Sequence, residues 1–195
     1  MGLDMYLNKM PRYKKVTADQ ICAVENYFEW LRKKEEGNEY ANCTFKGWCG
    51  YDLSDLPDVE TIEYLRQFYK VTYSGWDTEK KWPWHRIHEQ VGYWRKANQI
   101  HAWFVEHVQD GIDDCDYHRE VTKEILEELL DTCHEVLCNP DLAELRLPTQ
   151  CGFFFGGTEY DEYYMQDLKN TMDIITQVLE TTDFEKEMLY YVSSW

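Results

Sequence analysis

The spacing of apolar residues constrains this chain more than any other feature, because the period changes along the sequence. At the start, Leu3, Met5 and Leu7 alternate with polar residues, which is the pattern of a short strand. The tail over residues 184–195 is β-prone and predicts a second strand of the same small sheet, beside the first. Between these ends the apolar residues recur mainly at helical spacing. The sequence therefore predicts an α+β fold, with about four main helices packed on a small, mostly antiparallel sheet.

Capping residues and breakers set the expected ends of these helices. Thr17 and Gln20 form a capping box before the first helix, and Thr122 and Thr158 are N-cap candidates before the third and fourth. The expected helices cover residues 18–36, residues 93–109, the segment between Thr122 and Asn139, and residues 159–180. A shorter helix over 58–68, a strand over 69–73, and a loop over 38–57 with one strand near Phe45 complete the prediction.

Length and composition place the chain among ordinary globular proteins. With 195 residues, 44% of them hydrophobic, it can bury a core without disulfides or metal, and we expect a single domain over residues 1–195. No apolar stretch approaches the roughly 18 residues that span a bilayer, and the N-terminus lacks a secretory signal pattern. The seven cysteines are an odd number, which favours reduced thiols and a location in the cytoplasm, away from membranes.

Three groups of residues have the spacing of zinc ligands, but none forms a paired CxxC frame. They are His85 with His88, Cys115 with His118, and Cys133 with His134 and Cys138. Cys133 also fits the apolar stripe of the third predicted helix, where cysteine behaves as a small hydrophobic residue. We therefore predict no metal site and no cofactor.

The net charge of −17 is concentrated in the second half of the chain. Residues 106–195 hold 5 Lys+Arg and 22 Asp+Glu, whereas residues 1–105 hold 15 of each. Such a half repels nucleic acid backbones, so we expect no nucleic acid partner. It can instead attract a basic partner protein or mimic DNA, and the alternative interpretation is simply solvated helix faces.

The candidate binding site lies on the helix predicted over residues 93–109. Trp94, Asn98 and His101 fall along one flank of that helix at 100° per residue. An indole, a carboxamide and an imidazole together suit a flat polar ligand such as a nucleobase. The alternative is that Trp94 and His101 are border residues of the core whose N–H groups are satisfied by backbone. The complete predicted ligand-binding set is Trp94, Arg95, Lys96, Asn98, His101, Trp103, Tyr160 and Tyr164.

Two further segments bear on ligand binding and catalysis. Residues 74–86 mix aromatics with cations such as Lys80 and Lys81, which is typical of an ordered loop that lines a site. His101 with Asp161 or Asp167 would make an acid–base pair if the fold brought them together. No nucleophile, P-loop or dinucleotide-binding motif is present, so no catalytic residue is assigned.

Several stretches resemble a family of small proteins encoded by phages and prophages. They are MGLDMYL at 1–7, YWRKANQIHAWFV at 93–105, and GFFFG at 152–156 followed by YDEYY at 160–164. The resemblance covers nearly the whole chain. It implies a protein made in the cytoplasm of an infected bacterium, and it carries no catalytic residues.

These observations lead to three functional expectations. The first is a phage-encoded binding protein that captures a small nucleotide-like signalling molecule and so counters host defence. The second is an acidic inhibitor that binds a host protein in the manner of a DNA mimic. The third is a nucleotide-processing enzyme with His101 as acid or base. Assembly into a homo-oligomer is compatible with each.

Overall fold

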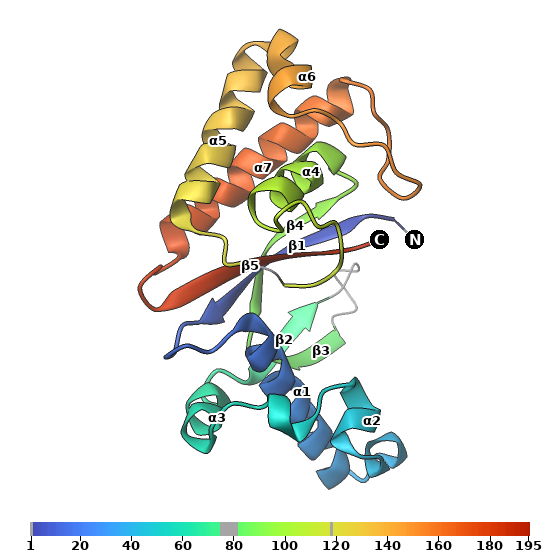
Figure 1. Cartoon of the computed structure of the whole chain (residues 1–195), viewed down its shortest axis with the longest axis vertical. Coiled ribbons are helices and arrows are strands. Elements are labelled where there is room, and N and C mark those ends of the chain that lie inside the picture. The colour runs from blue at the N-terminus through green and yellow to red at the C-terminus, as the bar shows by residue number, and fades with distance from the viewer. Residues whose placement is uncertain (1, 75–81, 118) are drawn as a thin grey trace. The chain divides into compact units, whose positions relative to one another are not determined.

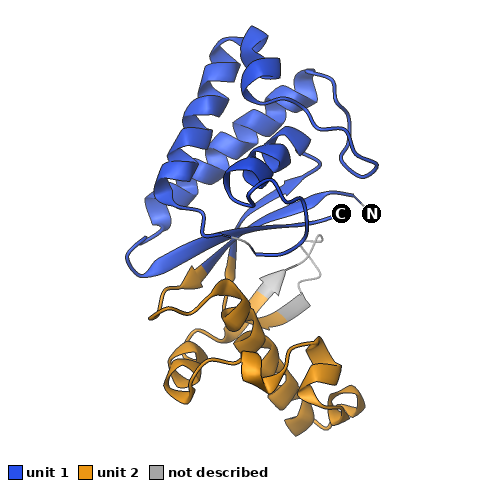
Figure 2. Cartoon of the chain, in the orientation of Figure 1, with its two compact units in different colours: residues 1–9, 90–195 blue, residues 10–89 orange. Residues whose placement is uncertain are grey.

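The structure, a computed structural model, describes residues 2–74, 82–117 and 119–195 (Figure 1). Internal contacts divide the chain into two compact units, which Figure 2 shows in blue and orange. Unit 1 comprises Met1–Lys9 and Gln90–Trp195, and unit 2 comprises Met10–Glu89. The predicted α+β class is confirmed, although the strands form two small antiparallel sheets rather than one. The expectation that residues 1–195 form a single domain stays a prediction.

A three-stranded sheet with the order β4-β1-β5 is the centre of unit 1. β1 covers Asp4–Pro11, β4 covers Glu89–Arg95 and β5 covers Glu187–Ser194. The alternation at the start of the chain decides which face of β1 is buried, because successive side chains of a strand point to opposite faces. Met5 and Leu7 are fully buried, and Tyr6 between them is only partly so. The two predicted terminal strands and their adjacency in the sheet are confirmed.

Four α-helices belong to unit 1: α4 (Asn98–His107), α5 (Lys123–Cys138), α6 (Ala143–Arg146) and α7 (Glu162–Thr181). The two longest, α5 and α7, run side by side (Figure 1). Thr122 is the N-cap of α5, where its side chain accepts a hydrogen bond from the backbone N–H of Ile125, as the sequence predicted. Leu129 of α5 and Leu168 of α7 are fully buried in the same apolar cluster.

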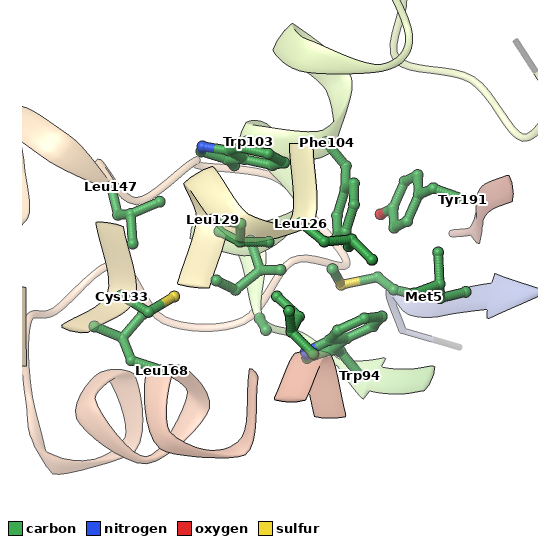
Figure 3. Packing of buried hydrophobic residues seen from close by; sticks show 14 of the residues in the cluster. Met5, Trp94, Trp103, Phe104, Leu126, Leu129, Cys133, Leu147, Leu168 and Tyr191 are labelled. Carbon is green, nitrogen blue, oxygen red and sulfur yellow. The ribbon is translucent and has the colours of Figure 1, made fainter. Parts of the chain in front are cut away.

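The core of unit 1 fills the space between the helices and the sheet, as the close-up in Figure 3 shows. Phe104 of α4 stacks on Tyr191 of β5 with ring centroids 4.2 Å apart. Gly92 of β4 allows close packing, because a Cβ there would lie 3.0 Å from the side chain of Ile174 on α7. Burial of a side chain as large as Phe contributes about 1.5–3 kcal/mol, so this cluster stabilises unit 1 strongly.

Two predicted helix starts are wrong. The helix expected over 93–109 begins at Asn98, and the residues before it form β4. Trp94 therefore projects from a strand, so helical spacing does not relate it to Asn98. The last long helix begins at Glu162 rather than 159, because Asp161 is its N-cap in place of Thr158. The Asp161 carboxylate accepts hydrogen bonds from the N–H groups of Tyr163 and Tyr164.

Unit 2 is built around α1 (Ala18–Glu35), which begins at the predicted capping box of Thr17 and Gln20. Two shorter helices, α2 (Phe45–Cys49) and α3 (Val59–Arg66), pack against it. The strand predicted near Phe45 is therefore wrong, because that residue begins α2. β2 (Lys70–Ser74) pairs antiparallel with β3 (Trp82–Arg86). Three short 3-10 helices complete the described elements of the chain, at Glu39–Asn42, Leu53–Asp55 and Pro140–Leu142.

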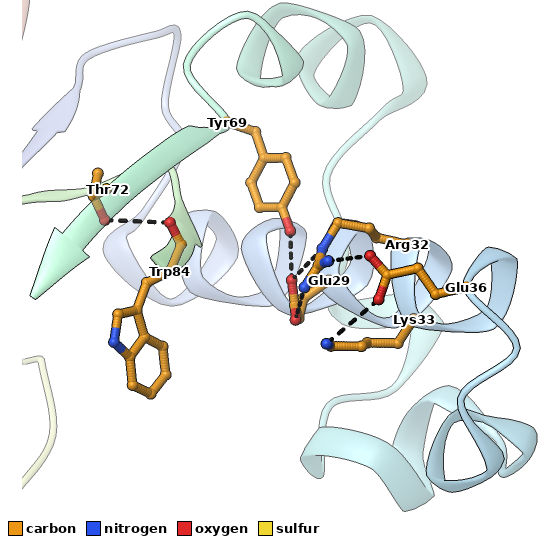
Figure 4. Close-up of polar contacts among 7 residues, drawn as sticks. All are labelled: Glu29, Arg32, Lys33, Glu36, Tyr69, Thr72 and Trp84. Carbon is orange, nitrogen blue, oxygen red and sulfur yellow. Dashed lines mark hydrogen bonds and ion pairs between the residues drawn. The ribbon is translucent and has the colours of Figure 1, made fainter. Parts of the chain in front are cut away.

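A polar network on α1 is the best-defined electrostatic feature of unit 2 (Figure 4). The Arg32 guanidinium bonds both carboxylate oxygens of Glu29, at 2.6 and 3.0 Å, and the Tyr69 hydroxyl donates to Glu29 at 2.8 Å. Burial raises the pKa of Glu29, but the hydrogen bonds from Arg32 and Tyr69 lower it by more, so the pKa lies below its ordinary value. Burial raises the pKa of the Tyr69 hydroxyl, and its hydrogen bond to Glu29 raises that pKa further, although Arg32 opposes the shift.

Seven α-helices are present in the described ranges 2–74, 82–117 and 119–195, and four of them have ten or more residues. The prediction of about four main helices and a shorter one over 58–68 omitted α2 and α6, which are too short to leave a clear periodicity in the sequence. None of the helices in the described part of the chain has the length and apolar character to cross a bilayer.

Candidate functional site

The three residues predicted to face a ligand are inside unit 1. Trp94 is 3% exposed, Asn98 2% and His101 0%. The Trp94 indole N–H donates to the Thr171 hydroxyl oxygen at 3.0 Å, so its polar group is satisfied within the core. The structure places all three side chains in the core, away from solvent. Their role in ligand binding stays a prediction.

His101 links three parts of unit 1. Its Nε2 lies 2.9 Å from a carboxylate oxygen of Asp113, and its Nδ1 lies 2.7 Å from the hydroxyl of Tyr191. Because a carboxylate only accepts, Nε2–H donates to Asp113, and Nδ1 of the neutral ring accepts from Tyr191. Burial lowers the pKa of His101, and Asp113 opposes this only in part. The indole of Trp195 also donates to Asp113, at 3.1 Å.

This arrangement does not support the acid–base role suggested for His101. The partner is Asp113, and Asp167 instead accepts a hydrogen bond from Gln99 at 3.4 Å. Asp161 is occupied as the cap of α7. A general base must reach the proton that it removes, and a fully buried imidazole with both nitrogens bonded does not contact substrate.

Asn98 holds a loop, which we call the 149–160 loop after its residues. Its carboxamide nitrogen donates to the backbone oxygens of Phe155 at 3.1 Å and Gly157 at 2.8 Å. Its carboxamide oxygen accepts from the backbone N–H of Gln150 at 2.8 Å. One buried side chain thus satisfies backbone groups at both ends of the loop, which otherwise carries few backbone–backbone bonds.

Other contacts fix the same loop. The backbone N–H of Leu3 donates to the oxygen of Phe154 at 3.0 Å. The Thr149 hydroxyl donates to the backbone oxygen of Thr158 at 3.0 Å, and the Thr149 N–H lies 3.4 Å from the hydroxyl oxygen of Tyr160. Next to the loop, the buried Tyr164 hydroxyl donates to the backbone oxygen of Leu147 at 2.9 Å. The predicted residues Tyr160 and Tyr164 therefore hold backbone, although Tyr160 is still 40% exposed.

Lys96 and Gly156 show how closely the loop packs on the end of β4. Gly156 has a φ of +92°, and a Cβ there would lie 3.2 Å from the Lys96 Cβ and 3.4 Å from its backbone oxygen. Lys96 itself has a φ of +61°. The side chains of Arg95 and Lys96 are exposed, as a role for either in binding an anion requires. Trp103 is 6% exposed and stacks on His107 at 4.1 Å, so it belongs to the core.

The structure therefore brings four predicted residues together around one loop, in a role that the sequence did not predict. Asn98, Lys96, Tyr160 and Tyr164 contact or flank the 149–160 loop, whereas Trp94 and Trp103 are core residues.

The tip of the 149–160 loop exposes one aromatic ring almost completely. Phe153 is 96% exposed, although its neighbour Phe155 is 7% exposed and packs edge-on against His101 with centroids 5.1 Å apart. A short apolar run between glycines, such as this one, is typical of a buried strand or a packed turn, and residues 153–155 form a turn. Tyr163, in the first turn of α7, is 82% exposed. The one signal for Phe153 in the sequence is an apolar run between glycines outside any periodic segment.

Unit 2 contains a hollow that the sequence analysis missed. It is largely open to solvent and has a volume of about 840 Å³, and its walls come from the end of α1, from α2 and from the segments on either side of α2. The lining residues are Trp30, Lys34, Asn42, Cys43, Thr44, Phe45, Lys46, Asp52, Leu53 and Ser54. The Lys34 ammonium lies 4.1 Å from the centroid of the Trp30 ring, and the Lys46 ammonium lies 2.7 Å from Asp52. The contributing segments are separate in sequence, so no short motif signals the hollow.

The residues that have the spacing of zinc ligands lie in different surroundings in the structure. Across residues 2–74, 82–117 and 119–195, no three His, Cys, Asp or Glu side chains converge as a metal site. His118 lies outside the described residues, as do Lys80 and Lys81 of the aromatic segment. His88 lies against Glu25 and Arg86, at 3.0 and 2.6 Å. Burial raises the pKa of the Cys133 thiol to about 12, so it stays protonated in the core.

No family model, curated protein or solved structure matches this chain. The geometry of the chain's own residues is therefore what bears on its function, and the resemblance to phage proteins stays a prediction.

Proposed function

We propose that the protein is an interaction protein whose 149–160 loop docks into a basic partner protein. The observation that carries this proposal is Phe153, which is 96% exposed on a loop that Asn98 holds at both ends. Exposed aromatic rings are common anchors of protein interfaces, because they bury a large area on binding. A loop that is already ordered loses less conformational entropy when it binds, which favours affinity.

The charge of unit 1 supports a basic partner. Its residues 1–9 and 90–195 hold 8 Lys+Arg and 23 Asp+Glu, a net charge of −15. Glu159 and Glu162 next to the loop are exposed and form no ion pair within the described ranges. A partner with an apolar pocket rimmed by Lys or Arg would match both the ring and the carboxylates. If the chain is a phage protein, as its resemblance suggests, the partner is a host protein and binding would inhibit it.

Affinity capture from bacterial lysate with three forms of the protein tests this proposal. Phe153→Ala should lose a captured host protein that the wild type retains. Leu145→Ala is the matched control, because Leu145 is another exposed apolar residue of unit 1, 77% exposed and outside the loop. Retention should also weaken as salt increases, since the rim contacts are charged. Equal capture by the wild type and Phe153→Ala, or capture that does not respond to salt, would contradict the proposal.

Capture of a small nucleotide-like ligand is a second proposal, and its binding site is the hollow in unit 2 rather than α4. The specific observation is a volume of about 840 Å³ lined by two aromatic rings and two lysines. Ligand pockets of proteins hold roughly 300–1,000 Å³. The Trp30 ring can stack on a base, with the buried Phe45 packed behind it, and Lys34 and Lys46 offer cations for phosphate. In a phage protein such capture would remove a host signalling nucleotide and counter host defence.

Calorimetric titration with a panel of linear and cyclic nucleotides tests the second proposal. Lys34→Ala should weaken any binding at least several-fold, because one cation of the hollow is removed. Lys70→Ala is the control, since Lys70 is an exposed cation of unit 2 that does not line the hollow. Absence of binding across the panel, or an equal loss in both variants, would remove capture at this site.

A further inference from the structure

One pair of side chains on the outer surface of α5 has the geometry of two metal ligands. His134 and Cys138 are four residues apart, so they lie on the same face of the helix, and both are exposed. The Cys138 sulfur lies 3.7 Å from Nε2 of His134. The pair is distinct from the 149–160 loop and from the hollow in unit 2, and neither proposed function uses it.

The observed separation matches the one that a tetrahedral zinc ion imposes. Zinc binds sulfur at about 2.3 Å and imidazole nitrogen at about 2.0–2.1 Å, so the two donors of a tetrahedral site stand about 3.6 Å apart. The His134–Cys138 pair is already at 3.7 Å. It can therefore take a metal with little rearrangement of either side chain.

The electrostatic surroundings favour a cation. Cys138 is the last residue of α5, and the C-terminal end of a helix carries partial negative charge. Asp131, about one turn before His134, is exposed and adds a carboxylate to that surface. Glu135 is paired with Arg146 at 2.8 Å and is not an available ligand. No third ligand converges on the pair within the described part of the chain, so one copy supplies half a site.

We infer that His134 and Cys138 form a zinc half-site that is completed by the same pair of a second copy of this chain. Two copies related by a two-fold axis through the metal supply two thiolates and two imidazoles, the Cys2His2 set of closed zinc sites. On binding, each Cys138 thiol loses its proton to solvent and each His134 coordinates through its neutral Nε2. Each chain carries a net charge of −17, so the two copies repel each other until the metal joins them.

Zinc titration of the metal-free full-length chain, followed by sedimentation velocity, tests this inference. The thiols are kept reduced with a phosphine and the buffer is at physiological ionic strength. We expect conversion from monomer to dimer, complete at one zinc per two chains. Cobalt(II) should give a thiolate charge-transfer band together with the visible spectrum of a tetrahedral ion.

Three variants identify the ligands. His134→Ala and Cys138→Ser should each lower the apparent zinc affinity at least about tenfold and abolish the dimer, since even the loss of an outer partner of a metal site costs about 10- to 100-fold. Cys115→Ser is the matched control, because Cys115 is another exposed free thiol of unit 1 and lies outside α5, the 149–160 loop and the hollow. Its dimer should be unchanged.

Two results would overturn the inference. One is zinc uptake by Cys138→Ser equal to that of the wild type, which would place the metal on other thiols. The other is a complex of one zinc with one chain that stays monomeric, which would show that no second copy completes the site. Circular dichroism of each variant checks that the fold is kept, as expected for exposed positions.

Discussion

Unit 1 and unit 2 differ in net charge and in how deeply their polar networks are buried. Unit 1 has a net charge of −15 and buries Asn98, Gln99 and His101 completely, with their polar groups bonded inside. Unit 2, residues 10–89, holds 12 Lys+Arg and 14 Asp+Glu, a net charge of −2. Its main network, around Glu29 and Arg32, is partly exposed.

The difference matters because a buried polar group costs more to disturb than an exposed one. Asn98 and His101 connect segments that are far apart in the sequence, and nothing inside the core can replace their partners. The Glu29–Arg32 pair joins two residues of one helix, and water competes for both. We therefore expect substitutions in the buried networks of unit 1 to have larger and more distant effects than substitutions in the network of unit 2.

The largest effect is expected in the apolar core of unit 1. Phe104→Ala should lower the free energy of unfolding by roughly 3–5 kcal/mol, because Phe104 is fully buried and stacked on Tyr191. The exposed Phe153→Ala should change stability by less than about 0.5 kcal/mol. Urea unfolding followed by circular dichroism measures both. Similar losses for the two variants would show that Phe153 is also buried.

Asn98→Ala should have the next largest effect. It leaves the backbone oxygens of Phe155 and Gly157 and the N–H of Gln150 without their partner, and each such group that stays buried costs about 1–3 kcal/mol. Water can reach part of the loop once it moves, so we expect a total of roughly 2–4 kcal/mol. Limited proteolysis should cut the variant within residues 149–160. A variant that resists protease as well as the wild type would show that Asn98 does not hold the loop in place.

Protonation of His101 should have an intermediate effect that depends on pH. The pKa of His101 in the folded protein lies below its ordinary value of 6.5. Below pH 6.5 the unfolded chain therefore binds a proton at His101 more readily than the folded chain does. The contribution of His101 to the free energy of unfolding is therefore fully present above pH 6.5 and is lost as the pH falls. Between pH 7 and pH 5.5 the wild type should lose part of its stability advantage over His101→Gln, up to about 1 kcal/mol. An advantage that grows in acid would mean that the folded ring gains a proton instead.

The smallest effect is expected for the partly exposed network of unit 2. The pKa of Glu29 is below its ordinary value of 4.5, so its contribution is present above that pH and lost as the pH falls further. Because solvent screens this pair, Glu29→Gln should cost less than about 1 kcal/mol at pH 7. Urea unfolding measures the change. A loss as large as that of Asn98→Ala would remove the contrast between the units.

The features that the sequence predicted well are the local ones. The capping box at Thr17 and Gln20, the cap at Thr122 and the alternation of Leu3, Met5 and Leu7 each act within a few residues, and each has the predicted structure. The start of α4 was missed because Trp94 and the residues around it are compatible with either a strand or a helix until their neighbours are known.

The candidate site could not be predicted because its contacts are long-range. Asn98 bonds residues 52 to 59 positions away, and His101 bonds a residue 90 positions away. An amide and an imidazole on an apolar face give the same sequence pattern whether they bind a ligand or a distant loop of the same chain. Apolar runs are mostly buried, so the sequence gives no signal that Phe153 is exposed, and its exposure depends on where Asn98 holds the loop.

The account depends on Asn98 keeping the 149–160 loop ordered in the free protein, and the backbone N–H of Gln150 reports this directly because its partner is the Asn98 carboxamide oxygen. Amide hydrogen exchange of Gln150 measures it in the wild type and in Asn98→Ala. We predict slow exchange in the wild type and exchange near the rate of an unprotected amide in the variant, while amides in α5 and α7 stay protected. Fast exchange of Gln150 in the wild type would contradict the account.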